Sequence, residues 1–279
     1  MISDIDGLPR APFASLTEGA RAVLECPDAE EKARLGHNLA ALWRSGALPL
    51  LADDNEPPMP DRPRRPARPE LLSHRDMPKR TFKGPRGRFA LLHSLAHIEL
   101  NAIDLAFDMA GRWAGEGLPR AFYDDWIKVG DEESKHFLAV QGRLRAMGGG
   151  YGDLPAHNGL WEAAEETRHD LLARLAVVPL VLEARGLDVT PMMIERLSGA
   201  GDRESAEVLG MIYREEQQHV GAGARWFTYL CDQRGLRPDE TFHALVRKHF
   251  RGLLKPPFNV EARNTAGLNP DFYEPLTSR

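Results

Sequence analysis

The strongest constraint on the fold of this chain is a pattern of carboxylate and imidazole side chains that occurs twice. In each copy a glutamate is followed 33 or 34 residues later by a second glutamate, which begins a Glu-x-x-His step. On a helix, both ends of such a step lie on one face, about one turn apart. The residues of the two copies are Glu99, Glu133 and His136, and then Glu183, Glu216 and His219.

The step alone is not specific, because it occurs four times, at 133/136, 166/169, 216/219 and 240/243. The positions of turns distinguish these copies. If two antiparallel helices bring ligands to one level, the turn between them must lie midway. The midpoint of the first copy is Glu116, inside Gly-Glu-Gly, and that of the second lies between Gly199 and Ala200, inside Ser-Gly-Ala-Gly. Each helix would climb roughly 25 Å to its turn, at about 1.5 Å per residue. The second copy requires a helix that continues past Gly186 and Pro191.

Apolar residues recur at helical spacing through most of the chain, and no stretch shows the alternation of a strand. The ranges with this pattern are 15–26, 28–46, 89–114, 119–147, 159–185, 202–230 and 238–254. We expect Pro179 to kink the helix over 159–185, and Gly186 to interrupt it before a short helical stretch over 191–197. The chain is therefore predicted to be all-α. A four-helix bundle over 89–233 follows a helical segment and proline-rich arm over 1–88, and precedes a helix and extended tail over 234–279.

Glu99 lies in the middle of an apolar stripe, where a charge is costly unless it is paired or bound to metal. In di-iron carboxylate bundles, two helices each supply a Glu-x-x-His step and two others each supply one glutamate. The six residues fit that set. Carboxylate and imidazole ligands suit iron or manganese, and the thiolates that favour zinc are absent from the pattern. We expect two iron ions, with manganese or a mixed pair as alternatives.

Two further features allow more than one interpretation. The helix that carries Glu99 also carries a polar stripe. Its members are His93, His97, Asn101, Asp104 and Asp108. His93 and His97 could bind metal without Glu99, or the stripe packs against other helices or meets solvent, with His97 supporting a metal ligand. Tyr213, one turn before Glu216, is either a donor or radical relay beside the metals or a core tyrosine.

The chain carries a net charge of −5, but its charges are unevenly distributed. Between Asp61 and Arg88 there are ten Lys/Arg and three Asp/Glu, a balance of +7, so the remainder carries −12. Such an arm could attract a phosphate-rich partner, tRNA among them, or it could pack back onto the acidic body. The rings of Phe258, Phe272 and Tyr273 indicate that the tail lies against the body.

Composition and the N-terminus indicate a cytoplasmic protein that does not enter a membrane. Cys26 and Cys231 are the only cysteines, too few for a disulfide framework. The first ten residues carry two aspartates and no apolar run, unlike a signal peptide. No stretch approaches the roughly 18 apolar residues of a membrane span.

Four motifs of the bundle resemble the ferritin-like superfamily. They are His97–Asp104, Glu132–Phe137, Leu182–Asp188 and Glu215–His219. More narrowly, the chain resembles a bacterial ferritin-like family of unassigned function, and this likeness includes Arg65–Pro69 in the arm and Phe250–Asn259 in the tail. Glu183-Ala184-Arg185 is also similar to the di-iron tRNA hydroxylases. The resemblance implies a ferritin-like bundle with a metal pair and names no reaction.

Several functions are compatible with these features. The first is an oxygen-activating di-iron oxidase or hydroxylase, which would use dioxygen, an electron donor and a substrate that the sequence does not identify. The others are a tRNA-modifying di-iron hydroxylase that uses the basic arm over 61–88, an iron-storage or iron-handling protein, and a metal-free scaffold. Storage is disfavoured because roughly 90 leading and 50 trailing residues would obstruct a ferritin-type shell.

Overall fold

Most of the predicted helical stretches are single helices in the structure, a computed structural model that describes residues 12–53, 55–73, 75–78 and 84–278. Within these residues no strand forms, and Leu71 and Ala156 make one isolated β-bridge. The prediction of an all-helical fold is therefore confirmed. The α-helices are α1 (Leu16–Glu25), α2 (Ala29–Arg44), α3 (Gly84–Arg112), α4 (Arg120–Ala146), α5 (Gly159–Thr167), α6 (Leu171–Val177), α7 (Ala184–Gly199), α8 (Arg203–Gln233), α9 (Pro238–His249), α10 (Val260–Thr265) and α11 (Pro270–Tyr273).

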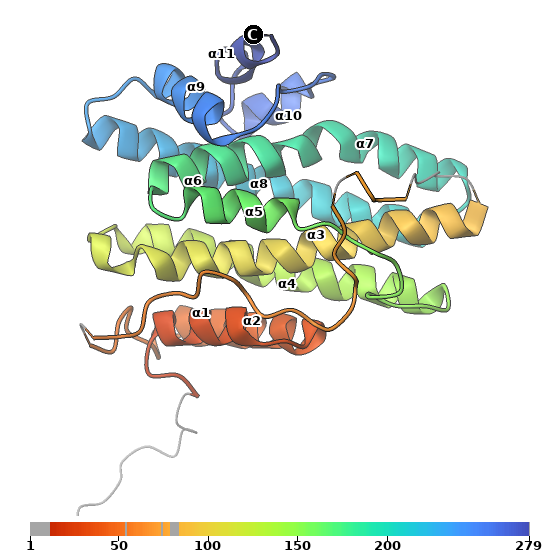
Figure 1. Ribbon diagram of the computed structural model, residues 1–279, viewed down its shortest axis with the longest axis horizontal. Helices are drawn as coiled ribbons and strands as arrows, with labels where there is room; N and C mark the ends of the chain where they lie inside the picture. The colour runs from red at the N-terminus through yellow and green to blue at the C-terminus, as the bar shows by residue number, and fades with distance from the viewer. Residues whose placement is uncertain (1–11, 54, 74, 79–83, 279) are drawn as a thin grey trace, which may run out of the picture.

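The helices are stacked in layers around a central bundle (Figure 1). Helices α3 and α4 form one antiparallel pair, and α7 and α8 form another. The N-terminal helices α1 and α2 cover α3 and α4 from one side, whereas α9, α10 and α11 lie on the opposite side, beyond α6 to α8. The bundle thus lies between the two ends of the chain.

Both turns lie where the spacing of the glutamates predicts them. After α3, the short 3-10 helix η1 (Ala114–Glu116) leads to Gly117, which has φ 68°. After α7, Gly201 has φ 78° and α8 begins two residues later. Glycine takes this left-handed conformation without the steric cost that a side chain would add. The two pairs of helices therefore reverse direction at the required levels.

The helix predicted over 159–185 is not one helix. It ends at Thr167, and α6 begins after Asp170, whose carboxylate accepts a hydrogen bond from the Leu172 amide at 3.0 Å. A π-helical segment, η2 (Val178–Glu183), then leads directly into α7. Pro179 lies at its start, and the missing N–H of proline disturbs the regular i to i−4 pattern. Glu183 is the last residue of this widened segment.

The expected interruption at Gly186 is wrong, because α7 runs from Ala184 to Gly199 through both Gly186 and Pro191. Pro191 has no N–H to donate to the carbonyl of Leu187, four residues earlier. The side-chain amide of Asn259, in the tail, donates to that carbonyl at 3.2 Å. A contact from a distant segment thus compensates for a local helix breaker.

Helix α2 packs closely on the bundle because glycines lie at its contacts with α3 and α4. An ideal Cβ at Gly36 in α2 or at Gly130 in α4 would lie 2.7 Å from the Phe107 ring of α3. Phe107 is fully buried between them. Because glycine has no side chain, Gly36 and Gly130 let α2 and α4 pack directly against the Phe107 ring of α3.

The arm and the tail both lie against the helical body. Arg65 in the arm pairs with Asp104 at 2.9 Å, and Arg62 pairs with Glu165 at 2.5 Å. Of the tail rings, Tyr273 is buried and lies against Phe258, with ring centroids 4.6 Å apart and the ring planes tilted by 52°. The packing of the tail is therefore confirmed, and part of the basic arm is neutralised by the acidic body.

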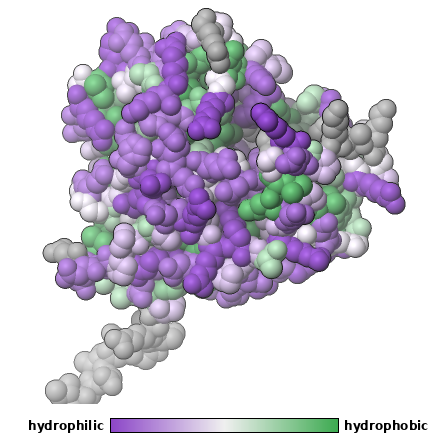
Figure 2. Space-filling model, in the orientation of Figure 1, coloured by the Kyte–Doolittle hydropathy of each residue, from purple (hydrophilic) through white to green (hydrophobic). Residues whose placement is uncertain are grey.

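The surface in the orientation of Figure 1 is mostly hydrophilic, with small hydrophobic patches (Figure 2). Both Cys26 and Cys231 are free thiols. No helix in the described part of the chain combines the length and the hydrophobicity needed to cross a membrane.

Candidate metal centre

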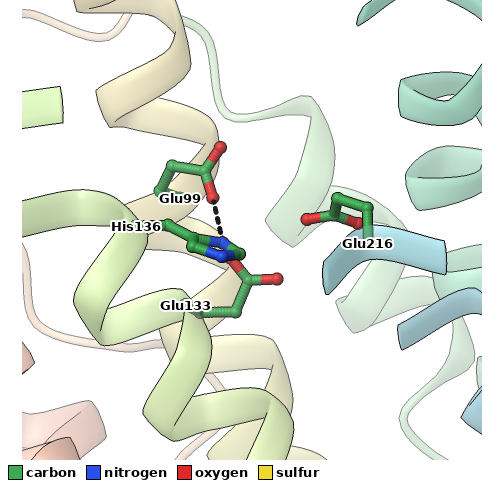
Figure 3. A group of neighbouring side chains, drawn as sticks. All are labelled: Glu99, Glu133, His136 and Glu216. Carbon is green, nitrogen blue, oxygen red and sulfur yellow. Dashed lines mark hydrogen bonds and ion pairs between the residues drawn. The ribbon is translucent and has the colours of Figure 1, made fainter. Parts of the chain in front are cut away.

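Four of the predicted ligands meet in the middle of the bundle. Glu99 of α3, Glu133 and His136 of α4, and Glu216 of α8 each offer one ligand atom, and these atoms lie within 4.8 Å of one another. Figure 3 shows Glu99, Glu133 and His136 together, with the Glu216 carboxylate pointing towards them from the opposite side. The His136 Nδ1 atom is 3.3 Å from both the Glu99 and the Glu133 carboxylates. This buried cluster could hold a metal ion.

The two remaining predicted ligands adjoin the same group. The His219 Nδ1 atom lies 3.0 Å from Glu133 Oε1 and 3.6 Å from Glu216 Oε1. The two Glu133 oxygens therefore face different imidazoles, since Oε2 is the atom near His136. Glu183 is close enough for the charges of Glu216 and Glu133 to raise its pKa.

Each imidazole is held at its outer nitrogen by a carboxylate from the opposite helix. His136 Nε2 is 2.7 Å from Glu215 of α8, and His219 Nε2 is 2.9 Å from Glu132 of α4. A carboxylate acceptor keeps the proton on Nε2, which leaves Nδ1 free to bind a metal. The arrangement is reciprocal, so the two helices orient each other's ligands.

Glu132 and Glu215 were not among the residues predicted for the site. The signal that could have identified them is the doubled glutamate that opens each step, Glu132-Glu133 and Glu215-Glu216. In a helix, neighbouring residues point about 100° apart, so the first glutamate of each pair faces the adjacent helix while the second faces the cluster.

Burial and mutual repulsion dominate the electrostatics. Burial, followed by the charges of Glu216 and Glu133, raises the pKa of Glu183 to about 8. Burial and the charge of Glu133 also raise the pKa of Glu99 well above its usual value. At Glu133 burial acts in the same direction, but hydrogen bonds with His136 and His219 outweigh it and lower the pKa. Without a cation, the cluster therefore shares protons among its carboxylates and imidazoles.

Several buried atoms of the cluster lack a well-aligned hydrogen bond, although Glu133 Oε1 lies 3.0 Å from His219 Nδ1 and Glu99 Oε2 lies 3.3 Å from His136 Nδ1. They are Glu99 Oε2, Glu133 Oε1, Glu183 Oε2 and His219 Nδ1. A buried polar atom left without a hydrogen bond costs about 1–3 kcal/mol, and a bound cation would compensate for this cost. All four are lone-pair donors of the kind that bind iron or manganese, and the residues present fit a metal site.

The polar stripe of α3 faces away from this cluster's ligands and tethers other segments. His93 Nε2 accepts hydrogen bonds from the amides of Gly152 and Leu154, at 3.0 and 3.3 Å. His97 contacts the Tyr151 hydroxyl at 2.8 Å and the His157 carbonyl at 2.9 Å. These contacts favour the packing interpretation, because both imidazoles fix the crossover between α4 and α5.

The acidic members of the stripe form ion pairs with cations that are buried or partly buried. Asp104 pairs with Lys32 of α2 and with Arg65 of the arm, and Asp108 pairs with Arg112 and Arg174. Lys32 and Asp104 are both fully buried. Asp104 and Asp108 therefore make structural ion pairs, most of which join α3 to neighbouring segments.

The Tyr213 hydroxyl is directed to the tail, where it accepts a hydrogen bond from the Asn259 side chain at 2.9 Å. The role of Tyr213 beside the metals remains a prediction. Its hydroxyl contact favours a structural one.

Comparison with known proteins gives a family for this arrangement. The family described as "Protein of unknown function (DUF455)" matches residues 25–274. The chain belongs to this family. The DUF455 match extends from the end of α1 to the end of α11, so it includes all six predicted ligands. A Haemophilus influenzae relative named "Uncharacterized protein" is 43% identical over 210 residues, which cover 73% of this chain and 72% of the relative. No solved structure matches the chain.

Proposed function

We propose that this protein is a di-metal carboxylate protein with a ferritin-like bundle, and that its metals are two iron ions, a manganese pair or a mixed pair. The observation that carries the proposal is the reciprocal arrangement on α4 and α8. Each helix offers a Glu-x-x-His step to the cluster and orients the imidazole of the other helix. Glu99 and Glu183 complete the set of four carboxylates and two imidazoles expected of a metal pair.

The residues of the cluster would have different roles in metal binding. Glu133 would hold metal together with both imidazoles, because its two oxygens face His136 and His219 separately. Glu99, Glu183 and Glu216 would supply the remaining carboxylate ligands, and Glu216 belongs to the same close group as Glu99 and His136. Glu132 and Glu215 would hold the Nε2 protons of the imidazoles throughout.

We further propose that the protein is an oxygen-activating oxidase or hydroxylase. Bound iron or manganese would supply the one-electron and dioxygen chemistry that side chains cannot perform. The chain's own contribution is to keep the centre dry, since Glu99, Glu133, His136 and His219 are all at most 3% exposed. Exclusion of water protects reactive species and strengthens the electrostatic interactions inside the site.

The test is loading of metal-free protein with ferrous iron under anaerobic conditions, followed by exposure to air. The expected result is a near-ultraviolet or visible absorption band in the wild-type protein and none in the Glu99→Ala variant. A wild-type protein that remains folded by circular dichroism and gains no band would contradict oxygen activation.

The tRNA-modifying alternative has less support. Of the arginines that would bind phosphate, Arg62 and Arg65 are engaged by Glu165 and Asp104. Arg64 and Arg68 are exposed and remain available. The alternative predicts salt-sensitive tRNA binding that is lost in the Arg64→Ala/Arg68→Ala variant.

A further inference from the structure

A cavity of about 670 Å³ lies against two of the helical segments that carry proposed ligands. Its walls come mainly from α3, from the crossover before α5 and the start of α5, from η2 and the start of α7, and from the segment that runs from the end of α9 into α10. Ile98 and Leu182 line it, and each directly precedes a proposed ligand, Glu99 or Glu183. The cavity and the carboxylate cluster therefore share the same stretches of helix.

The charge of the cavity lining is entirely of one sign. Four cationic side chains line it, and none of its lining residues is Asp or Glu. They are Arg185, Arg251, Lys255 and Arg263. This is unusual in a chain whose net charge is −5. An all-cationic lining favours an anionic ligand.

Two of these cations have structural partners and two do not. Arg185 donates to the carbonyls of Lys255 and Pro257, and Arg263 pairs with Asp188 at 2.7 Å. The side chains of Arg251 and Lys255 are exposed and make no ion pair with any described residue. Arg263 is 2% exposed, and its Nη1 is a buried donor without a hydrogen-bond partner. The lining thus retains unused capacity to bind an anion.

The rest of the lining is largely apolar. Ile98 and Leu253 are 44% and 38% exposed, which is high for large hydrophobic side chains, and both line this cavity. Val181, Leu182 and Phe258 extend the apolar surface. A ligand that covers these side chains would be stabilised by removal of apolar area from water. A concave apolar site of this size with a few charged groups is typical of small-molecule binding.

We propose that this cavity binds an amphipathic organic anion, with its carboxylate at Arg251 and Lys255 and its hydrocarbon part against Ile98 and Leu182. Because Ile98 and Leu182 directly precede Glu99 and Glu183 in the chain, we assign this class of molecule as the substrate of the proposed metal centre. The assignment as substrate rests on the proposed function, whereas the binding itself does not. An RNA partner is disfavoured, because a base would leave most of the apolar lining uncovered.

The test is isothermal titration of the full-length protein with decanoate. We expect the Arg251→Ala/Lys255→Ala variant to bind decanoate at least tenfold more weakly, because charged hydrogen bonds are lost. The matched control is Arg247→Ala/Lys248→Ala, which removes two exposed cations of α9 outside this lining and should leave the Kd unchanged. Decanol should bind more weakly than decanoate. From octanoate to decanoate, each methylene should tighten binding by about three- to fourfold.

The proposal is overturned if decanoate does not bind, if decanol binds equally well, or if both double variants lose affinity alike. It is also overturned if bulk tRNA, but not decanoate, binds in a manner sensitive to Arg251 and Lys255. The same titration in the Glu133→Gln variant separates the two proposals. Decanoate binding there without metal supports the cavity even if the metal proposal fails, and metal content is measured independently of the ligand.

Discussion

At the scale of single residues, the candidate centre depends on side chains one position away from the proposed ligands. Glu132 and Glu215 do not face the cluster, yet they hold the two imidazoles that do. Such outer carboxylates fix the tautomer and the orientation of a metal-binding histidine, and they make it a better ligand.

Replacement of Glu215 by glutamine should therefore weaken metal binding without abolishing it. We expect the Kd for Mn²⁺ to rise about 10- to 100-fold, with a similar rise for Glu132→Gln. Competition with a fluorescent chelator measures this change. Glu207→Gln is the control, because Glu207 is an exposed residue of the same helix. An equal effect in all three variants would show that these carboxylates do not act through the imidazoles.

The buried Lys32 provides a second test at the residue scale. Its ammonium group pairs with Asp104 and donates to the Leu24 and Arg64 carbonyls, both at 3.2 Å. Removal of one partner of a buried ion pair typically costs about 3–5 kcal/mol, so Lys32→Met should lower the free energy of unfolding by an amount of this order. Guanidinium melts of chelated protein measure the loss.

The control for Lys32 lies two residues away on the same helix. Arg34 pairs with Glu30 and Glu31, but its side chain is 57% exposed. Arg34→Met should cost less than about 1 kcal/mol, as exposed ion pairs do. Equal losses in the two variants would mean that the buried pair contributes no more than a surface pair.

At the scale of elements, the segments on either side of Glu183 could be predicted only in part from the sequence. The level of the turn at 199–201 follows from the spacing of Glu183 and Glu216 alone, because helix rise is constant. The π-helical segment and the continuation of α7 through Gly186 do not follow from this spacing. They depend on Pro179 packing against α8 and on Asn259 reaching the Leu187 carbonyl, and both are long-range contacts.

The contact between Pro179 and Gly223 makes a prediction about this element. A Cβ at Gly223 would lie 2.5 Å from the Pro179 Cβ atom, whereas one at Gly221 would lie no closer than 3.8 Å to its neighbours. Gly223→Ala should therefore destabilise the protein by about 1–3 kcal/mol through overpacking. Gly221→Ala, in the same helix, should be neutral or stabilising by up to about 1 kcal/mol.

Thermal unfolding of the two alanine variants measures this difference. If Gly223→Ala also displaces η2, its metal content should fall because Glu183 is the last residue of that segment. Equal stability of the two variants would contradict the close packing of Pro179 on α8.

At the scale of the whole molecule, the bundle is enclosed by the two ends of the chain. The helical class, the turn levels and the convergence of Glu99, Glu133, His136 and Glu216 could be predicted from periodicity and spacing. Two other features could not be predicted from the sequence. They are the ion pair of Arg65 with Asp104 and the hydrogen bonds of Glu132 and Glu215 with the imidazoles of the opposite helix. These depend on which face of one helix meets another, and a single sequence does not specify that.

Metal removal should lower the stability of the whole chain. A ligand that binds only the folded state at 100 times its Kd stabilises that state by about 2.7 kcal/mol. A shift of 1 kcal/mol changes the melting temperature by about 2–4 °C for a large domain, so chelation should lower it by about 5–10 °C. Scanning calorimetry measures the shift, which should disappear in Glu133→Gln. An equal shift in that variant would place the metal elsewhere.

The central claim is tested most directly by the metal content of the purified full-length protein, reconstituted with ferrous iron or Mn²⁺ and measured by mass spectrometry. We expect about two ions per chain in the wild-type protein and in the Glu207→Gln control, and little or none in Glu133→Gln. A folded wild-type protein that holds no metal, or a Glu133→Gln variant that retains both ions, would contradict it.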